Sequence, residues 1–487
     1  EKVAYELALG VSYAGYRSLV TMKHVGLNVA MDAFVNSALT GVQGGFVLLV
    51  ADDPGMHSSQ NEQDSRYLAD FAHIPCLEPA TGQEAYDYTR DAYGLSERLK
   101  LPVMLRLVTR LAHCRGSVAR RAPDPVSSVG LPHPSEVPGW VLAPANARAQ
   151  YQKLRQKLGP LLAEIGPYNR LIPGSARRGL ALAGLGRALF FELAREAPSL
   201  LDWPRLEVSG LPLGGDLIDR FLGHTDEIFV FEEDYPYVED LLRNHAVGVA
   251  VHGRRDRTIS LTGELNASQV RDVLGIEHPA GKAPVTLAVP PRPPRFCDGC
   301  GHVDAFVALK EALGRVGAAG TRIFGDIGCY AMAAGAPYDS MHACVEMGAS
   351  VGMALGAAFA GLQPGVAVIG DSTFVHSGLP GFTSFARARA NVTLLIMDNR
   401  TTGMTGQQPV ETVDMLEAIV TGLGLDPARV HTIVPLAKRH AENVAVIEAA
   451  LRHEGPSVVI CRRECVQASR KGVNREHDRC VREAARG

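Results

Sequence analysis

Residues 366–406 combine polar side chains in a pattern that suits a magnesium–diphosphate site. Two apolar runs, 366–369 and 392–397, are predicted to be buried parallel strands around a helix near 382–389, and polar residues follow each run. Ligands of open α/β sheets bind at the carboxyl ends of strands, so Asp371 and Asn399 should offer oxygen ligands to one hard cation. The turn at 403–406 can direct backbone N–H groups at the same phosphates. The alternative is an ordinary strand–helix–strand unit with polar strand ends.

The cysteines indicate a second centre. Cys297 and Cys300 form a C-x-x-C pair in a glycine-containing turn, a spacing that can place two thiolates on one metal centre. Cys329 and Cys465 lie at or just past predicted strand ends and could complete a site for a [4Fe–4S] cluster or a structural Zn²⁺. The residues alone do not separate these two groups. A dithiol redox pair is a third interpretation, and Cys461 competes with Cys465 as the fourth ligand.

The elements that must position these residues alternate between strands and helices, which predicts doubly wound parallel sheets. The first predicted domain, 1–114, has helices at 2–16, 26–39, 64–72 and 84–99 and strands at 18–22, 45–51 and 103–108. The second, 151–277, has strands at 179–183, 205–208, 227–231 and 247–251 and helices at 186–194, 216–222 and 237–245. The third, 296–487, also holds a tightly packed helix near 348–362 and a strand at 457–460. Proline-rich linkers are predicted at 115–150 and 278–295.

Composition limits the class of protein. The chain has 487 residues, 46% of them hydrophobic, and a net charge of −3, which indicates globular domains and no nucleic-acid footprint. We expect no membrane span, because the run at 348–362 is too short, and without a signal peptide a cytoplasmic location is predicted. Nine cysteines in such a chain favour metal or redox chemistry over a disulfide framework. The chain begins on a predicted helix, so we expect a further strand and helix before Glu1.

Two other polar groups are candidates for a site or for structure. Residues 52–66 follow a predicted strand and are rich in hydrogen-bonding side chains. Within them, Arg66 and His57 are candidates for binding a substrate carboxylate, since Arg can bind a carboxylate through two parallel hydrogen bonds. Residues 232–234, all acidic, are interpreted as solvated caps of a strand rather than as a paired acid site.

Several stretches resemble the large (alpha) subunit of the indolepyruvate:ferredoxin oxidoreductase family, within the thiamine-diphosphate-dependent 2-oxoacid:ferredoxin oxidoreductases. The matching stretches are EKVAYELALGVSYAG, TMKHVGLN, ADDPGMHSSQNEQDSR, FCDGCGH, GDIGCY, MGASVGMALG, GDSTFVHSG and MDNRTTGMTG. Ser372 departs from the family signature, which has Gly there. An opening Tyr-Pro-Gly-Thr-Pro-type segment and a ferredoxin-like domain, both features of the family, fall outside these residues.

The resemblance implies three α/β domains: pyrimidine-binding, transketolase-C-terminal-like and diphosphate-binding. It implies oxidative decarboxylation of aryl 2-oxoacids with coenzyme A, electron transfer through a [4Fe–4S] cluster to ferredoxin, and a small beta subunit as partner. A non-redox thiamine decarboxylase or ligase and a non-catalytic subunit are the alternative functions. The distant pyruvate enzyme places its proximal cluster on four cysteines that match Cys297, Cys300, Cys329 and Cys465.

The resemblance also implies individual roles. Thiamine diphosphate and Mg²⁺ are expected between the end domains, with the metal on Asp371, Asn399 and the Thr401 carbonyl. Glu1 aligns with the family glutamate that hydrogen-bonds the aminopyrimidine ring, and His376 is a candidate for the reacting carbonyl. The remaining expected cofactor contacts are Gly348, Ser350, Gly370, Ser372, Gly403, Met404 and Thr405.

Overall fold

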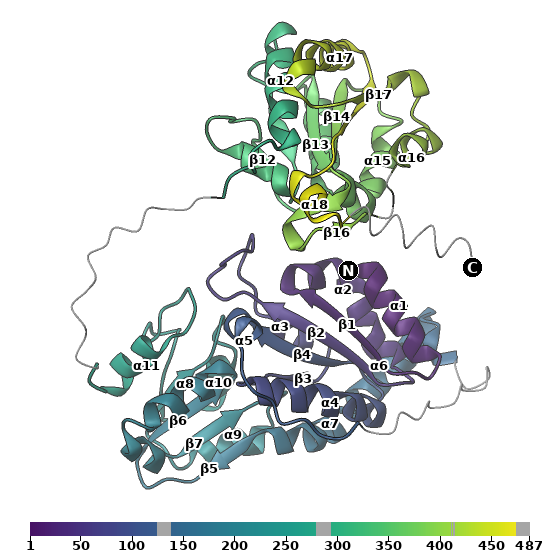
Figure 1. The fold of residues 1–487 in the computed structure, drawn as a ribbon. Helices are drawn as coiled ribbons and strands as arrows, with labels where there is room; N and C mark the ends of the chain where they lie inside the picture. The colour runs from purple at the N-terminus through teal and green to yellow at the C-terminus, as the bar shows by residue number, and fades with distance from the viewer. Residues whose placement is uncertain (124–137, 279–293, 411, 413, 474–487) are drawn as a thin grey trace. The chain divides into compact units, whose positions relative to one another are not determined.

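The computed structural model describes residues 1–123, 138–278, 294–410, 412 and 414–473. The chain divides into two compact units, which we call unit 1 (residues 1–285) and unit 2 (residues 286–487). Figure 1 labels the helices and strands of both units. The division into three domains stays a prediction, although unit 1 contains two separate sheets.

Unit 2 is built on one six-stranded sheet in which every pair of neighbouring strands is parallel. Its strand order is β12-β11-β13-β14-β18-β17. The bounds are β11 (Ile323–Gly325), β12 (Ala343–Cys344), β13 (Gly365–Gly370), β14 (Val392–Asp398), β17 (Val430–Ile433) and β18 (Pro456–Arg462). The central strands are predicted correctly as fully buried apolar runs, which parallel strands covered on both faces require.

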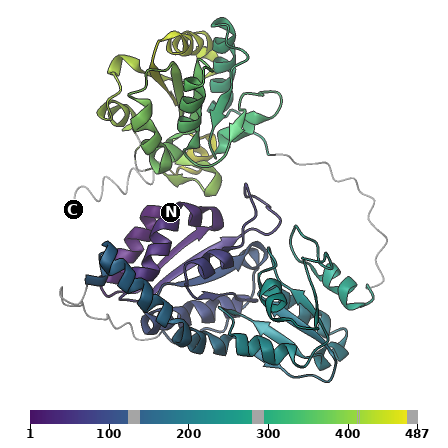
Figure 2. The ribbon, with the colours of Figure 1, turned by 180° about the vertical axis from the view of Figure 1, so that it is seen from behind.

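Helices cover both faces of this sheet, as the two opposite views show (Figures 1 and 2). Alternate strand residues feed two cores, as the period of two in a strand requires. Val366 and Val368 pack with α12 (Gly301–Arg315) and α17 (His440–Arg452). Ala367 and Ile369 pack on the other face with α13 (Ala349–Phe359), α15 (Leu379–Phe385) and α16 (Leu416–Gly422). This arrangement is the predicted doubly wound α/β fold.

The helix after β13 differs from its prediction. Helical structure begins at Asp371 and runs through α14 (Asp371–Thr373), a π-helical turn (Phe374–Gly378) and α15, which ends at Phe385. The predicted range of 382–389 is therefore wrong by about three helical turns at its start. Gly378, Pro380 and Gly381 hid the true start, because glycine and proline usually mark turns in a sequence.

The first sheet of unit 1 has the order β1-β2-β4-β3-β8. Its strands are β1 (Ser18–Lys23), β2 (Phe46–Asp52), β3 (Cys76–Leu77), β4 (Val103–Val108) and β8 (Gly210–Leu211). All pairs are parallel except β3 with β8. The helices of this part are α1 (Lys2–Tyr13), α2 (His24–Thr40), α3 (Ser65–Phe71), α4 (Gly82–Leu99) and α5 (Thr109–His113), which confirms the predicted alternation.

The second sheet of unit 1 has the order β10-β9-β6-β7-β5. Its strands are β5 (Arg170–Ile172), β6 (Arg178–Ala183), β7 (Arg205–Val208), β9 (Glu227–Phe231) and β10 (Ala250–His252). The helices of this part are α8 (Leu185–Ala194), α9 (Gly215–Leu222), α10 (Tyr237–His245) and α11 (Ala267–Leu274), whereas α6 (Pro144–Gln156) and α7 (Leu158–Ile165) contact helices α2 and α4 beside the first sheet. Helix α6 begins inside the predicted linker 115–150, and the strand predicted at 247–251 lies at 250–252.

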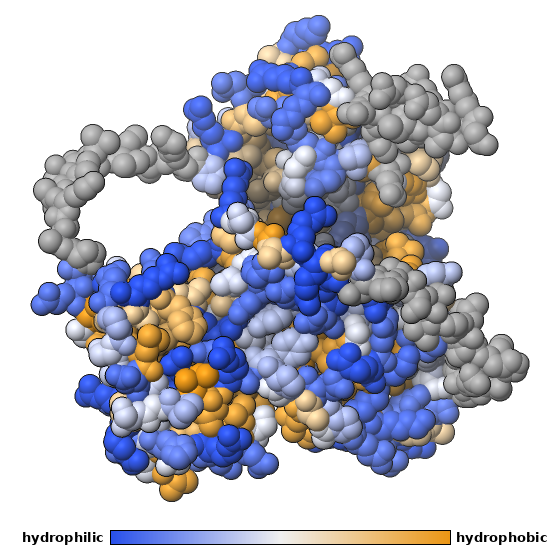
Figure 3. Space-filling view, turned by 60° about the horizontal axis from the view of Figure 1, so that its bottom comes forward, coloured by the Kyte–Doolittle hydropathy of each residue, from blue (hydrophilic) through white to orange (hydrophobic). Residues whose placement is uncertain are grey.

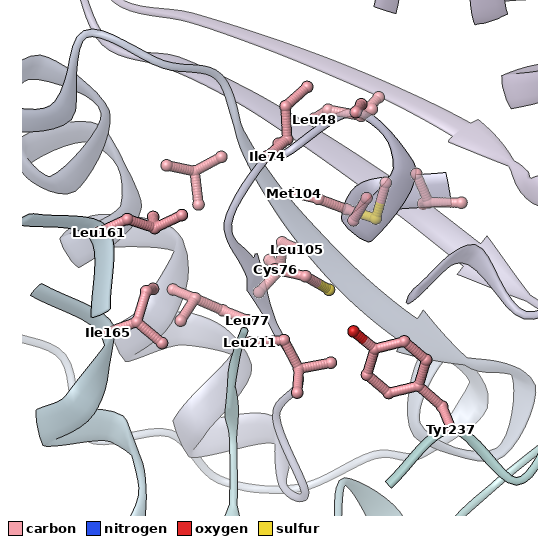
Figure 4. Packing of buried hydrophobic residues seen from close by; sticks show 14 of the residues in the cluster. Leu48, Ile74, Cys76, Leu77, Met104, Leu105, Leu161, Ile165, Leu211 and Tyr237 are labelled. Atoms are coloured by element: carbon pink, nitrogen blue, oxygen red, sulfur yellow. The ribbon is translucent and has the colours of Figure 1, made fainter. Parts of the chain in front are cut away.

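One hydrophobic core joins the two sheets of unit 1. Strand β8 leaves the second half of the unit and pairs with β3 of the first sheet, so that Leu211 lies opposite Cys76. Figure 4 shows this region, where Leu77 and Leu105 of the first sheet pack near Leu161 of helix α7. Burial of such side chains contributes about 1.5–3 kcal/mol each, so the shared core holds both halves together.

A buried ionic cluster at the same junction corrects one prediction. Glu232, Glu233 and Asp234 follow β9 and are at most 2% exposed, so they are not solvated caps. They form a network with Asp52, Asp64, Glu78, Arg66, Arg106 and Arg254, all of which are buried as well. The network links strand ends of both sheets, because Arg106 of β4 pairs with Asp52, the last residue of β2, and with Asp234 after β9.

The surface fits a water-exposed protein. Hydrophilic side chains predominate on the face drawn in Figure 3, and hydrophobic ones form separate patches among them. None of the helices in the described part of the chain has the length and hydropathy needed to cross a bilayer.

Candidate functional site

The predicted cofactor residues of unit 2 gather at the carboxyl edge of its sheet. The chain leaves β11 toward β12 on one side, whereas it leaves β13 toward β14 on the other. Such a reversal opens a crevice at the carboxyl ends of the two strands, which is where open α/β sheets bind ligands. Asp326 follows β11 and Asp371 follows β13, so both carboxyl groups lie at this crevice.

Asp371 is a buried carboxyl group at the start of a helix. Its two oxygens accept hydrogen bonds from the backbone N–H groups of Ser372, at 2.8 Å, and Arg400, at 2.7 Å. Burial, together with the neighbouring carboxyl group of Asp398, raises the pKa of Asp371 to about 7. Asp398 itself accepts a hydrogen bond from Arg462 Nε at 2.6 Å. A cation bound at Asp371 would favour its charged form, so the donor chemistry fits a divalent metal.

The residues after β14 form a compact turn beside Asp371. The Asn399 side-chain oxygen accepts a hydrogen bond from the Thr401 N–H at 3.1 Å. Ser372 and Thr402 share a hydrogen bond between their hydroxyl groups at 2.9 Å, which ties the turn to the helix that follows β13. The predicted diphosphate residues Gly403, Met404 and Thr405 then form one 3₁₀ turn. The structure therefore brings the Asp371 and Asn399 regions together as predicted.

Gly348 and Ser350 begin helix α13 at the same crevice. Asp326 accepts hydrogen bonds from the Ser350 N–H at 2.8 Å and from its hydroxyl at 2.5 Å. Burial raises the pKa of Asp326 to about 6. Gly348 has a φ of 93°, and a Cβ there would lie 2.7 Å from atoms of Ser377. Asp326 was not predicted, although Gly325-Asp326 repeats the strand-end pattern of Gly370-Asp371.

The four predicted cysteine ligands line one pocket. Cys297 and Cys300 precede helix α12, Cys329 follows β11, and Cys465 follows β18. Burial, together with the neighbouring thiols of Cys300, Cys465 and Cys297, raises the pKa of Cys329 to about 11. Cys461 also lines the pocket but is 3% exposed within β18. Burial, together with the nearby carboxyl group of Asp398, raises the pKa of Cys461 to about 12.

The cysteine pocket adjoins the turn at Asn399. Asn399 lines the same pocket, and its carbonyl oxygen accepts a hydrogen bond from the Cys465 N–H at 3.0 Å. A Cβ on Gly403 would lie 3.2 Å from the Cys329 sulfur and 3.9 Å from Asn399 Nδ2. The residues predicted to hold diphosphate and those predicted to hold a cluster therefore touch one another within unit 2.

Two further residues of this pocket escaped sequence reasoning. His302 is buried, its Nδ1 lies 3.5 Å from the Cys300 sulfur, and its Nε2 has no hydrogen-bond partner. Burial lowers the pKa of His302 to about 4, so the ring is neutral at pH 7. Arg463 bonds Asp304 of helix α12 and the Pro435 carbonyl, both at 2.9 Å. It thereby joins the C-x-x-C helix to the turn that carries Cys465.

The predicted residues of unit 1 have different surroundings. Glu1 caps helix α1, accepting a hydrogen bond from the Tyr5 N–H at 2.9 Å, and its side chain lies against Gly26 of helix α2. A Cβ on Gly26 would lie 2.5 Å from Glu1 Cγ, so only glycine leaves room for this contact. His57 is exposed and lies 3.7 Å from Glu264. In unit 2, His376 is exposed in the π-helical turn, with Nδ1 2.5 Å from the Ser377 hydroxyl.

Arg66 does not have the role that its sequence position suggested. Its guanidinium is fully buried and bonds Asp64 Oδ2 at 2.5 Å and Glu232 Oε2 at 2.8 Å, together with two backbone carbonyl oxygens. Because its donors are already used within the buried ionic cluster, we correct the prediction and assign Arg66 to the structure of unit 1. This role could not be predicted from the sequence, because the partner Glu232 is 166 residues away.

Comparisons with known proteins agree with this geometry. Residues 326–461 match the family described as "Thiamine pyrophosphate enzyme, C-terminal TPP binding domain". This region of unit 2 holds Asp326, Asp371, Asn399 and the 3₁₀ turn, so the candidate site lies within a C-terminal TPP-binding domain of the thiamine-pyrophosphate-enzyme type. Among solved structures, a 2-oxoglutarate:ferredoxin oxidoreductase from Magnetococcus marinus matches at 24% identity over 36% of this chain and 65% of its own, with a TM-score of 0.29.

Curated relatives give the narrower assignment. "Indolepyruvate oxidoreductase subunit IorA" of Archaeoglobus fulgidus is 37% identical over 96% of this chain and 77% of its own length. The protein of the same name from Thermococcus kodakarensis is 33% identical over 97% of this chain and 79% of its own. The chain belongs to this family of indolepyruvate oxidoreductase subunits.

Proposed function

We propose that this chain catalyses the oxidative decarboxylation of aryl 2-oxoacids of the indolepyruvate type. In this reaction a 2-oxoacid anion and coenzyme A give an aryl-acyl-CoA, CO₂, one proton and two electrons, and ferredoxin takes the electrons. The main support for this function is that one pocket is lined both by Asn399 of the thiamine domain and by Cys297, Cys300, Cys329 and Cys465. Bound thiamine diphosphate supplies the carbon nucleophile for decarboxylation, and a neighbouring redox group can accept the electrons one at a time.

The position of the cysteines supports a [4Fe–4S] cluster. Cys297, Cys300, Cys329 and Cys465 line one pocket beside Asn399, and four thiolates are the usual ligand set of such a cluster. One Zn²⁺ takes the same four ligands but has no redox chemistry. The cluster is proposed because the reaction releases electrons, which iron can accept and zinc cannot.

The oxygen ligands support the proposed magnesium site. Asp371, Asn399 and the Thr401 carbonyl would hold Mg²⁺, a hard cation that takes oxygen ligands and phosphate. The adjacent buried carboxyl groups of Asp371 and Asp398 favour such a cation between strand ends and diphosphate. The diphosphate would be bound by the backbone and hydroxyl groups of Gly348, Ser350, Gly370, Ser372, Gly403, Met404 and Thr405.

Three side chains keep proposed catalytic roles. Glu1 would hydrogen-bond the aminopyrimidine ring, a proton-transfer role that contributes about 10²–10⁴-fold to catalysis. Its fixed position against Gly26 supports a defined function for this side chain. His57 and His376 are exposed, as side chains that meet a substrate must be. We propose His57 for the substrate carboxylate and His376 for its carbonyl group.

The proposed partners follow from the reaction. The word "subunit" in the names of the relatives supports a second chain, which we propose is the small beta subunit of the same oxidoreductase. Coenzyme A, the aryl 2-oxoacid and ferredoxin complete the reaction. A cytoplasmic location would suit these partners.

Anaerobic purification with iron, zinc and thiamine analysis tests the proposal, followed by electron paramagnetic resonance after dithionite reduction. We expect about four irons per chain, and a cluster signal that Cys329→Ser and Cys465→Ser each remove. Cys344→Ser is the matched control, because Cys344 is exposed in the same unit and does not line the pocket. Cys461→Ser should keep the signal, which separates the two candidates for the fourth ligand.

The same measurements decide between the alternatives. Stoichiometric zinc without a cluster signal would overturn the redox mechanism and favour a non-redox thiamine decarboxylase or ligase. If the chain binds neither iron nor thiamine diphosphate, even in the presence of the partner chain, a non-catalytic subunit would be favoured.

A further inference from the structure

A pocket unconnected with the proposed cofactor residues lies in unit 1. Its walls are apolar side chains of several elements, among them Ile74, Leu101, Leu154, Leu161 and Leu211. Figure 4 shows Ile74, Leu161 and Leu211, together with Tyr237, which also lines the pocket. A concave apolar pocket with a few polar groups is the usual form of a small-molecule site.

The pocket lies at the edge of the first sheet opposite to the predicted catalytic edge. Ile74 and Leu101 come just before β3 and β4, so they mark the amino ends of these parallel strands. The polar stretch at 52–66 begins instead at the carboxyl end of β2, which is parallel to β4. Catalytic ligands of such sheets bind at the carboxyl edge. A ligand at the amino edge would therefore occupy a separate site.

Two cations at this pocket contact uncharged acceptors within the described part of the chain. The half-buried ammonium group of Lys157, at the junction of α6 and α7, donates to the Lys100 carbonyl oxygen at 3.0 Å. The exposed Arg155 lies 3.1 Å from the ring nitrogen Nε2 of His73. Burial, together with the neighbouring cations Lys100 and Lys153, lowers the pKa of Lys157 to about 8. A positive group in this setting is stabilised by an anion beside it.

The other charged groups of the lining do not neutralise these cations. Arg66 is already paired with Asp64 and Glu232 in the buried ionic cluster. Asp70 is the acidic residue of the lining, and its side chain is exposed to solvent. The lining thus combines apolar side chains with more basic than acidic ones.

We propose that this pocket binds a small carboxylate with an apolar, preferably aromatic, body. The carboxylate would meet Lys157 and Arg155, and the body would pack on the leucines and Ile74. A phosphate group fits less well, since phosphate sites are commonly built from glycine-rich backbone and none of the lining residues is glycine. An aryl acid could then bind to the protein at a site separate from the cofactor crevice.

Isothermal titration of the full chain with phenylacetate and indole-3-acetate tests the proposal. We expect one site per chain and at least tenfold weaker binding in Lys157→Met, which keeps most of the apolar stem while removing the charge. Arg155→Gln should weaken binding in the same direction. Arg148→Gln is the matched control for Arg155→Gln, because Arg148 is an exposed arginine of helix α6 that does not line the pocket. Binding in this control should equal that of the parent.

Two further probes separate the contributions. 2-Phenylethanol has the apolar body without the charge, and inorganic phosphate has charge without the body, so each should bind at least tenfold more weakly than phenylacetate. The titrations are repeated in Asp371→Ala, which changes only the proposed metal site. Equal phenylacetate binding in the parent and Lys157→Met, no binding at all, or loss of binding in Asp371→Ala alone would overturn the proposal. Failure of the proposed redox function would leave these titrations unaffected.

Discussion

Glu233 should make the stability of unit 1 depend on pH. This side chain is fully buried at the end of β9, where one carboxyl oxygen accepts a hydrogen bond from the Leu265 N–H at 3.0 Å. The other oxygen has no hydrogen-bond partner, and the nearest guanidinium, that of Arg254, is 3.9 Å away. The cluster around it holds six carboxyl groups but only three arginines. Glu233 is therefore the member best placed to stay protonated.

The magnitude follows from the linkage between pKa and stability. Burial raises the pKa of Glu233 from 4.5 to about 7 in the folded chain. Below pH 4.5 the carboxyl group is protonated in both the folded and the unfolded chain, so it does not change the free energy of unfolding. Between pH 4.5 and 7 only the unfolded chain releases the proton. The free energy of unfolding should thus fall as pH rises through this range. The total fall for this one group is about 3 kcal/mol, at 1.36 kcal/mol per pKa unit.

Glu233→Gln tests this reasoning, because glutamine has the same shape and cannot ionise. Both tryptophans of the chain, Trp140 and Trp203, lie in unit 1, so urea unfolding followed by tryptophan fluorescence reports on this unit. As the pH rises from 4.5 to 7.5, we expect the free energy of unfolding of the variant to increase by about 3 kcal/mol relative to that of the parent. Glu192→Gln, at an exposed glutamate of α8, is the control and should follow the parent. Parallel pH curves for Glu233→Gln and the parent would refute the argument.

Three other substitutions probe the site of unit 2. Asp371→Ala removes the anionic metal ligand and should abolish retention of thiamine diphosphate through gel filtration while leaving circular dichroism unchanged. Arg463→Met breaks the link to Asp304 and should lower the iron content severalfold after anaerobic purification, whereas full iron content would show that the link is dispensable. Gly348→Ala places a Cβ 2.7 Å from Ser377 at a φ of 93°, so it should destabilise unit 2 by more than about 1–2 kcal/mol in calorimetry, and an unchanged melting temperature would contradict this strain.

Local patterns predicted much of the fold and the place of the candidate residues in unit 2, whose functional roles stay predictions. The apolar runs of β13 and β14 are buried strands, and Asp371 and Asn399 follow them at one sheet edge as expected. These positions could be predicted because adjacent parallel strands turn a sequence spacing directly into a spatial one. The four cysteines also line one pocket, although Cys465 comes 136 residues after Cys329.

The start of the helix after β13 was missed for a local reason, its glycines and proline, whereas the other failures come from contacts over long sequence distances. Arg66 looked like an exposed substrate ligand because its partner Glu232 comes from the other sheet of unit 1. Strands β3 and β8 have only two residues each and pair antiparallel, so they leave no hydrophobic period to detect. His302 and Arg463 were missed because their roles depend on contacts with the cysteine pocket, which composition and periodicity do not report.

The main-chain hydrogen bond between Asn399 and Cys465 limits how these two segments can change. The bond joins backbone atoms just beyond β14 and β18, which pair residue for residue from Val392 with Pro456 to Asp398 with Arg462. Substitutions along either strand leave this alignment in place, whereas inserting or deleting one residue in only one of them would shift the alignment by a residue. A shift of one position also reverses which side chains face each core. Length, more than residue identity, should therefore be the property that these two strands must keep.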